Sequence, residues 1–188
     1  MGQLQIEEFF IFKYICEYMM YALRYLPWGM LIGVPLAVVV LKLVDSAQKR
    51  QQKPAAQRLP VMLFCVYIAV MLVITFLSRE NGSRSGAMDL QLFSTWGINA
   101  RNNAFVVENV LLFIPYGFLY SWNFRQTGTI WRCLLLGAVT SFGIELMQLV
   151  TGRGYFQIDD ILTNTLGALF GGILFWLVRL IGKAAGRR

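Results

Sequence analysis

Five long apolar runs follow one another along the chain, separated by polar connections. Crossing about 30 Å of hydrocarbon takes roughly 20 helical residues, so each run is long enough to be a membrane span. The expected spans are residues 28–44, 61–78, 106–122, 131–150 and 161–181. The pattern therefore predicts an all-α integral membrane helical bundle with about five transmembrane helices.

The segment 6–26 has a different pattern. It is rich in Phe, Tyr and Met but also carries five charged residues, and its tyrosines recur at helical spacing at Tyr14, Tyr18, Tyr21 and Tyr25. This pattern favours an aromatic amphipathic helix lying at the membrane interface, with a sixth span as the alternative. We accordingly divide the chain into 1–26 (interfacial helix), 27–104 (two spans and an outer loop) and 105–188 (three spans and a basic tail).

Composition excludes a water-soluble protein. Apolar residues make up 57% of the chain and charged residues only 14%, against roughly 45–50% and about 25% in soluble domains. Intrinsic disorder is excluded for the same reason. The chain has three cysteines without paired spacing and no histidine, so neither a disulfide framework nor a zinc site is predicted. We expect no metal and no cofactor. The N-terminus lacks a basic stretch before an apolar one, so no cleavable signal peptide is expected.

The distribution of charge predicts an orientation. In the five-span arrangement one set of connections holds eleven Lys and Arg against a single acid, Asp45, whereas the other side holds six bases and nine acids. Because Lys and Arg concentrate in cytoplasmic loops, the C-terminus is expected in the cytoplasm, with the N-terminal helix and the 79–105 connection outside. The basic, Gln-rich 45–58 connection is then a solvated loop near anionic lipid headgroups, and nucleic acid is not an expected partner.

Polar residues within the last three spans lie at a similar depth on the outer side. Glu145 and Gln148 share one helix face, as do Asp160 and Asn164. Because charged and amide groups are costly in lipid, we expect them to satisfy each other in one polar pocket facing outward. The predicted pocket residues are Asn109, Glu145, Gln148, Arg153, Asp159, Asp160 and Asn164. Glu108, beside Asn109, lies at the same depth.

Two structural alternatives remain open for these residues. The amides of Asn109, Gln148 and Asn164 could simply bridge helices. Asp159 and Asp160 open a helix, where acids favour the positive end of the helix dipole.

Small residues and a proline predict how the helices pack. Pro115 leaves the Leu111 carbonyl without its helical donor, so a kink beside Gly117 is expected. Gly167 and Gly171 form a GxxxG spacing, as do Gly29 and Gly33 in the first span. Close helix packing within one chain is preferred over dimerisation for these pairs, and the oligomeric state is left open.

Three ordered motifs carry a family resemblance. The run from Asn109 through Pro115 to Gly117 resembles the N-x-x-L-F-x-P-x-G opening of the VanZ-like family. The run Ser141 to Gln148 is similar to its S-x-x-I-E-x-x-Q segment. Arg153 followed by Asp159, Asp160, Asn164 and Gly167 is similar to its R…D-D-x-x-x-N-x-x-G segment.

The resemblance, which covers about residues 105–175, implies a bacterial membrane protein associated with reduced susceptibility to teicoplanin-type lipoglycopeptides. It implies no cofactor and no established enzyme activity. The preferred hypothesis is a non-enzymatic protein whose pocket binds an amphiphile, either the lipoglycopeptide antibiotic or a membrane lipid or lipid-linked cell-wall precursor. One alternative is a membrane-embedded enzyme on a lipid-linked substrate with Glu145 as candidate acid or base. A second is a structural bundle without a ligand.

Overall fold

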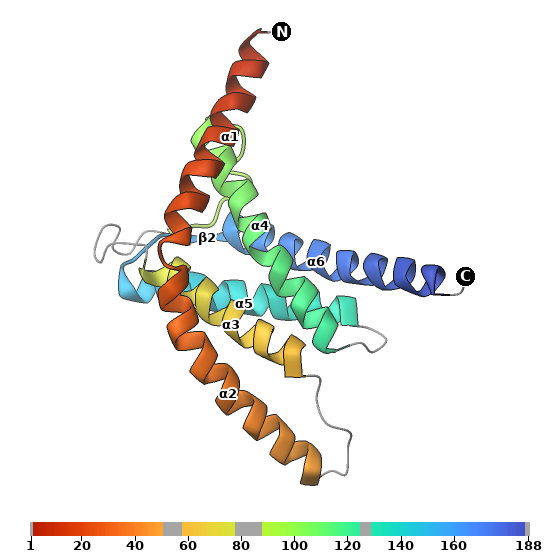
Figure 1. Cartoon of the computed structure of the whole chain (residues 1–188). Helices are drawn as coiled ribbons and strands as arrows, with labels where there is room; N and C mark the ends of the chain where they lie inside the picture. Colours follow the sequence, from red (N-terminus) through yellow and green to blue (C-terminus); the bar gives the residue numbers. More distant parts are fainter. Residues whose placement is uncertain (1, 51–57, 78–87, 125–128, 187–188) are drawn as a thin grey trace.

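Six helices make up nearly all of the computed structural model, which describes residues 2–50, 58–77, 88–124 and 129–186 (Figure 1). The helices are α1 (Gly2–Leu23), α2 (Leu26–Arg50), α3 (Arg58–Leu77), α4 (Ala100–Asn123), α5 (Thr129–Thr151) and α6 (Ile158–Ala185). Five of them, α2 to α6, are long and apolar enough to cross a membrane. The predicted fold class, an all-α membrane bundle with about five spans, is confirmed.

Four of the membrane helices contain an expected apolar run whole and extend beyond it at both ends, and α3 contains residues 61–77 of its run. The largest extension is in α2, which continues past the run through polar residues to Lys49 and Arg50. Such extensions are expected, because helical hydrogen bonding does not stop where the apolar residues do. The last residue of the second expected span, Ser78, lies outside the described residues.

Two short strands were not expected from the sequence. β1 (Met88–Asp89) pairs in parallel with β2 (Phe156–Gln157), with Met88 opposite Phe156 and Asp89 opposite Gln157. Each strand has only two residues, too few for an alternating pattern to be recognisable. The pairing fixes the segment before α4 beside the first residue of α6.

The N-terminal segment forms its own helix, as expected. α1 ends at Leu23, and a turn leads directly into α2. α1 extends away from the bundle alongside the beginning of α4 (Figure 1). The Arg101 Nε donates to the Tyr18 hydroxyl at 2.7 Å, and the rings of Tyr18 and Phe105 lie 4.9 Å apart. Its position at the membrane interface remains a prediction.

The closest helix packing joins α4 and α6. A Cβ added at Gly117, Gly167 or Gly171 would collide with a backbone carbonyl of the facing helix. A second contact of this kind joins α2 to α3, where a Cβ at Gly29 would come within 2.5 Å of the Val70 Cα and one at Gly33 within 2.8 Å of the Val66 Cα. Both GxxxG pairs therefore lie in contacts within one chain, the arrangement expected of small residues in membrane helices.

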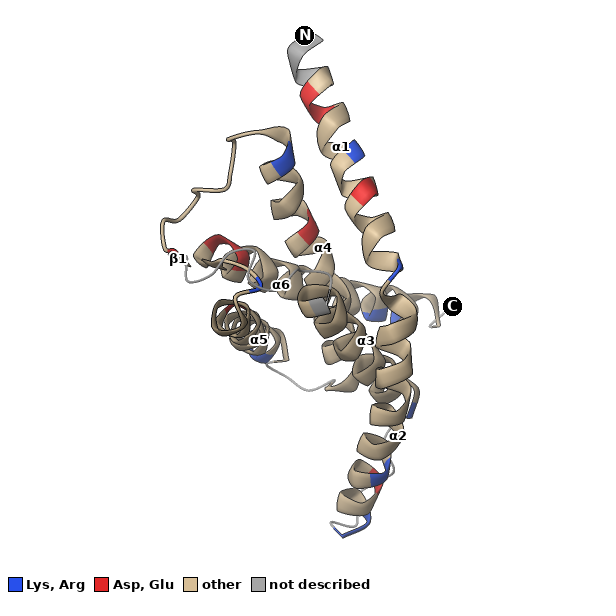
Figure 2. Cartoon of the chain, turned by 90° about the vertical axis from the view of Figure 1, so that its left-hand side faces the viewer, with Lys and Arg blue, Asp and Glu red and all other residues tan. Residues whose placement is uncertain are grey.

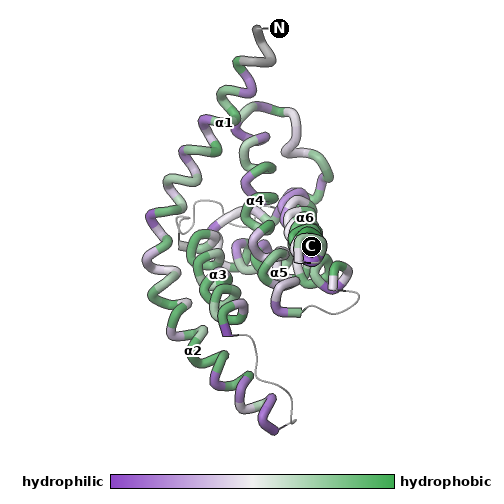
Figure 3. Tube along the Cα trace, turned by 45° about the vertical axis from the view of Figure 1, so that its right-hand side comes forward, coloured by the Kyte–Doolittle hydropathy of each residue, from purple (hydrophilic) through white to green (hydrophobic). Residues whose placement is uncertain are grey.

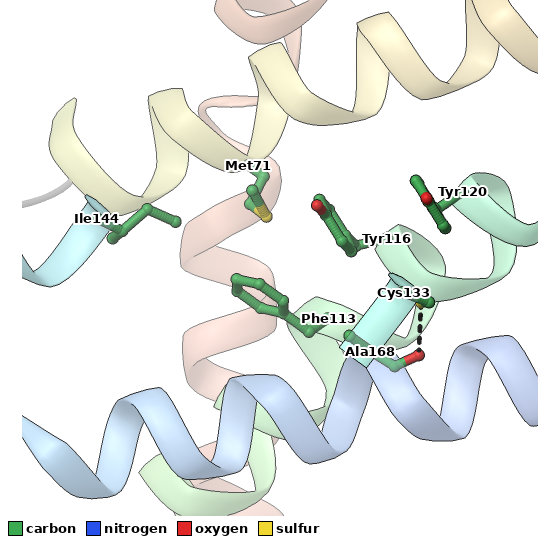
Figure 4. Packing of buried hydrophobic residues seen from close by; sticks show 7 residues of the cluster. All are labelled: Met71, Phe113, Tyr116, Tyr120, Cys133, Ile144 and Ala168. Carbon is green, nitrogen blue, oxygen red and sulfur yellow. Dashed lines mark hydrogen bonds between the residues drawn. The ribbon is translucent and has the colours of Figure 1, made fainter. Parts of the chain in front are cut away.

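Beside these glycines lies the apolar core, which draws on α3, α4, α5 and α6 (Figure 4). Its members are Met71, Phe113, Tyr116, Tyr120, Cys133, Ile144 and Ala168. The Cys133 thiol donates to the Ala168 carbonyl at 3.4 Å, drawn as the dashed line. Pro115 lies inside α4, which runs unbroken to Asn123, and the Tyr67 hydroxyl donates to the nearby Leu112 carbonyl. The kink expected at Pro115 stays a prediction.

Charged and apolar residues are unevenly distributed over the helices. Acidic residues lie on α1, on the first half of α4 and at the beginning of α6, while Lys and Arg gather at the far end of α2 (Figure 2). Apolar residues cover the middle of α2 and α3 (Figure 3). Residues 45–50 of the expected basic 45–58 loop are helical and belong to α2, so the loop prediction is wrong there, and residues 51–57 lie outside the described residues. Residues 79–87 of the 79–105 connection also lie outside them.

Candidate functional site

The polar residues predicted from the last three spans lie around the junction of α5 and α6. Glu145 and Gln148 are on the last two turns of α5 and are 2% and 1% exposed. The Glu145 Oε2 accepts from the Gln157 backbone N–H at 3.0 Å, and the Gln148 Nε2 donates to the Thr75 carbonyl at 3.3 Å. Glu145 thereby holds β2 against α5, and Gln148 joins α5 to α3.

Arg153 lies in the turn that follows α5. The turn passes through Gly152 at a φ of 62°, a left-handed conformation that glycine adopts without strain. The Arg153 backbone N–H donates to the Gln148 carbonyl at 2.9 Å, and its Nη1 donates to the Phe76 carbonyl at 2.8 Å. The half-buried guanidinium is therefore held between the ends of α3 and α5.

Asp159 binds the loop between β1 and α4. Its Oδ1 accepts from the Phe93 N–H at 2.7 Å and its Oδ2 from the Thr95 N–H at 3.0 Å. The Ser94 hydroxyl lies 3.5 Å from the same Oδ2 and donates to the Asp89 Oδ2 at 2.6 Å. Asp159 is 2% exposed. These bonds are charge-assisted and therefore stronger than neutral ones.

The neighbouring Asp160 turns to α4 instead. Its Oδ1 accepts from the Asn109 Nδ2 at 2.8 Å. One turn further along α6, the Asn164 Nδ2 donates to the Ser141 hydroxyl oxygen on α5 at 2.9 Å. The Asn164 Oδ1 is buried without a hydrogen-bond partner.

The structure thus gathers the seven predicted residues at one end of the bundle but gives them different partners. Asn109 meets Asp160 directly, while Asn164 meets Ser141 and Asp159 faces the 93–95 loop. The three amides connect helix to helix, as the structural alternative expected. A shared pocket open to the outside stays a prediction.

Several residues at this end of the bundle were not among the predicted pocket residues, and Ser94, Thr95 and Glu108 are three of them. Ser94 and Thr95 are in the loop between β1 and α4, far from Asp159 in the sequence. No local sequence pattern therefore connects them with Asp159. Glu108 is the third, and its Oε1 is buried without a hydrogen-bond partner. The signal for Glu108 was present, because it is an acid inside an apolar run and next to Asn109.

The residues predicted to govern helix packing lie at the α4–α6 contact or within α4. They are Pro115, Gly117, Gly167 and Gly171. Gly117 faces the Ala168 carbonyl, Gly167 the Val110 carbonyl and Gly171 the Ile114 carbonyl. Pro115 lies between these contacts. Among the described residues, no three His, Cys, Asp or Glu side chains are grouped so as to hold a metal ion.

Fold and site together define a class: a multi-pass helical membrane protein whose buried acids and amides gather where α5 meets α6. A family model described as VanZ/LLP1 matches residues 64–179, which include all of these polar residues and the glycine contact. The chain belongs to this VanZ-like family, and the resemblance of its three motifs is confirmed.

One curated relative is Protein VanZ of Enterococcus faecium. It is 33% identical over 72 residues, which cover 38% of this chain and 44% of that protein. The matched segment thus spans less than half of the relative's length. No solved structure matches the chain.

Proposed function

We propose that this protein lowers the susceptibility of a bacterial cell to teicoplanin-type lipoglycopeptides by binding an amphiphile in the outer leaflet. The amphiphile is either the drug, which carries a lipid tail, or the lipid-linked wall precursor that the drug recognises. The proposal places the α5–α6 junction on the outer face of the membrane and the C-terminus in the cytoplasm, as the distribution of Lys and Arg favours.

The observation that carries the proposal is the concentration of buried acids and amides, together with the half-buried Arg153, where α5 meets α6. Charged groups within membrane helices are costly, and they characteristically mark substrate or ligand pathways. Membership of the VanZ-like family and the similarity to Protein VanZ support the link to resistance.

Within this cluster we assign ligand contact to Asn109 and Arg153. Both are half-buried, whereas Glu145, Gln148, Asp159 and Asn164 are almost fully enclosed. The planar guanidinium of Arg153 suits a phosphate or carboxylate, which a lipid-linked precursor supplies at headgroup level. The enclosed residues hold the frame in which Arg153 is presented.

The contacts of Glu145 favour a positioning role over acid–base chemistry. Its carboxylate accepts from the Gln157 N–H, and the nearby Ser141 hydroxyl is engaged by Asn164. We therefore expect mass spectrometry to find the same envelope lipids and muropeptides in cells with and without the protein. A new lipid or muropeptide species in producing cells would favour the enzyme alternative.

Arg153→Ala and Glu145→Gln test the proposal in cells that make each variant at the wild-type level. In Arg153→Ala, loss of a charged hydrogen-bonding partner of the ligand costs about 1.5–3 kcal/mol, which is a tenfold or larger loss of affinity. Glu145→Gln instead weakens the contact with the Gln157 N–H and so the frame around Arg153. We expect both variants to lose the protection against teicoplanin. Arg132→Ala, an exposed arginine at the opposite end of α5, is the matched control and should protect like the wild type. Full protection by Arg153→Ala would contradict the proposal.

A further inference from the structure

The loop between β1 and α4 exposes most of its large apolar side chains, while Thr95 is buried, Ser94 is half-buried and the polar Gln91 and Asn99 are exposed. Five large apolar residues of this loop are between 43% and 63% exposed: Leu90, Leu92, Phe93, Trp96 and Ile98. The rings of Phe93 and Trp96 pack edge to face with centroids 5.5 Å apart. In a loop surrounded by water the opposite arrangement would be favoured, because exposing apolar surface to water costs free energy.

The polar atoms of the same loop turn toward the protein. The backbone N–H groups of Phe93 and Thr95 donate to Asp159, and the Gly97 N–H donates to the Asn103 Oδ1 at 2.8 Å. A loop in contact with lipid needs internal partners of this kind, because lipid offers none for its backbone.

Phe93 has a strained backbone conformation, in which its N–H points to Asp159 and its side chain is exposed. Its φ is 63°, in the left-handed region that residues with a Cβ rarely occupy. Strain of this kind persists only where the surroundings enforce it, and here the short bond from the Phe93 N–H to the buried Asp159 carboxylate does so. The side chain of Phe93 is 57% exposed.

The loop is tied to the N-terminal ends of two helices that are long and apolar enough to cross a membrane. β1 is paired with β2, which directly precedes α6, and Asp159 is in the first turn of α6. At its other end the loop leads straight into α4 at Ala100. The exposed apolar side chains therefore lie next to the first turns of α4 and α6.

We propose that the 90–98 loop inserts its apolar side chains into the bilayer leaflet at the α5–α6 junction. The hydrogen bonds from the loop to Asp159 hold the loop in this conformation. Trp and other aromatic residues are the side chains that membrane proteins place at this depth. The partner is the lipid leaflet itself. The inference does not depend on the proposed link to antibiotic susceptibility.

Fluorescence of Trp96 tests this in the full chain reconstituted into phosphatidylcholine vesicles. The wild-type signal minus that of Trp96→Phe reports Trp96 alone, despite the four other tryptophans. We expect this difference signal to lose most of its intensity when the lipid carries a nitroxide near its headgroup, and to resist acrylamide in the water. The same subtraction with Trp131→Phe is the control. Trp131 is 74% exposed at the start of a membrane helix, so its signal gives the response of a tryptophan at the end of a membrane span for comparison.

Two results would overturn the proposal. Quenching of the Trp96 signal by acrylamide as strong as that by the lipid nitroxide would place the loop in water. Protection from both quenchers would mean that protein covers the loop, as in contact with a second copy. If Trp96→Phe fails to fold, Ile98→Trp in the otherwise wild-type chain gives the measurement as an added signal with the same expected responses.

Discussion

Asp159 and Glu145 both place a carboxylate oxygen against backbone N–H groups. Asp159 accepts from Phe93 and Thr95, and Glu145 accepts from Gln157. Each acid thereby fixes a non-helical segment to the end of a membrane helix. At the scale of single residues, the acids of the VanZ-like motifs thus define the shape of this end of the protein.

Asp159→Asn should loosen the 93–95 loop without unfolding the helices. An amide offers one oxygen where the carboxylate offers two, so one of the two loop N–H groups loses its acceptor. An unsatisfied buried group costs about 1–3 kcal/mol. Hydrogen–deuterium exchange should show weaker protection of the Phe93 and Thr95 amides. Asp89→Asn is the control with a smaller expected effect, and unchanged protection in Asp159→Asn would contradict the assignment.

Which residues gather at this end was predictable from the sequence, but their partners were not. Helical spacing placed Glu145 with Gln148, and Asp160 with Asn164, at one depth. The bond from Phe93 to Asp159 joins residues 66 positions apart through a loop without regular structure. Neither periodicity nor local propensity carries information about such a contact.

At the scale of elements, α4 and α6 are held together by backbone approach. Three glycines, one on α4 and two on α6, let the helices meet where any Cβ would collide with a carbonyl. Dispersion contacts of this kind are a main source of helix association in lipid, where no hydrophobic driving force separates helix from lipid. The Asn109–Asp160 bond joins the same pair of helices.

Gly171→Ala should therefore destabilise the bundle, whereas Gly143→Ala should not. A Cβ at Gly171 meets the Ile114 carbonyl, and overpacking of this kind costs about 1–3 kcal/mol. A Cβ at Gly143 meets nothing within 4 Å, and alanine improves helix propensity there by up to about 1 kcal/mol. Thermal unfolding in detergent should show a lower midpoint for Gly171→Ala alone. Equal midpoints for the two variants would refute the close α4–α6 contact.

The helices themselves were the most predictable feature, because the length of an apolar run directly reflects the thickness of the bilayer. Their ends were less predictable, since polar residues such as those at the end of α2 continue the helix. The β1–β2 pairing was not predicted, because two-residue strands leave no pattern.

For the molecule as a whole, the separation of acids from bases leads to a prediction of sidedness. The acids on α1 and at the start of α6 lie away from the bases at the end of α2 (Figure 2). The predicted arrangement, with five spans and α1 lying at the interface, places α1 and the end of α6 on opposite sides of the membrane.

Labelling of intact cells with a membrane-impermeant maleimide measures this sidedness. In a Cys16→Ser background, Glu17→Cys on exposed α1 should react, because α1 is expected outside. Lys183→Cys, exposed near the end of α6, should react only after the cells are permeabilised. The reverse pattern would invert the orientation on which the proposed function depends.

The α4–α6 contact also bears on biogenesis. α4 leaves the ribosome before α6, with the whole of α5 between them. Until α6 is inserted, Asn109 lacks its Asp160 partner and the carbonyls of Val110 and Ile114 lack the glycines that cover them. α6 thus completes the contacts of α4, and a chain truncated before α6 would present an unmatched polar face to lipid and become a substrate for membrane quality-control proteases.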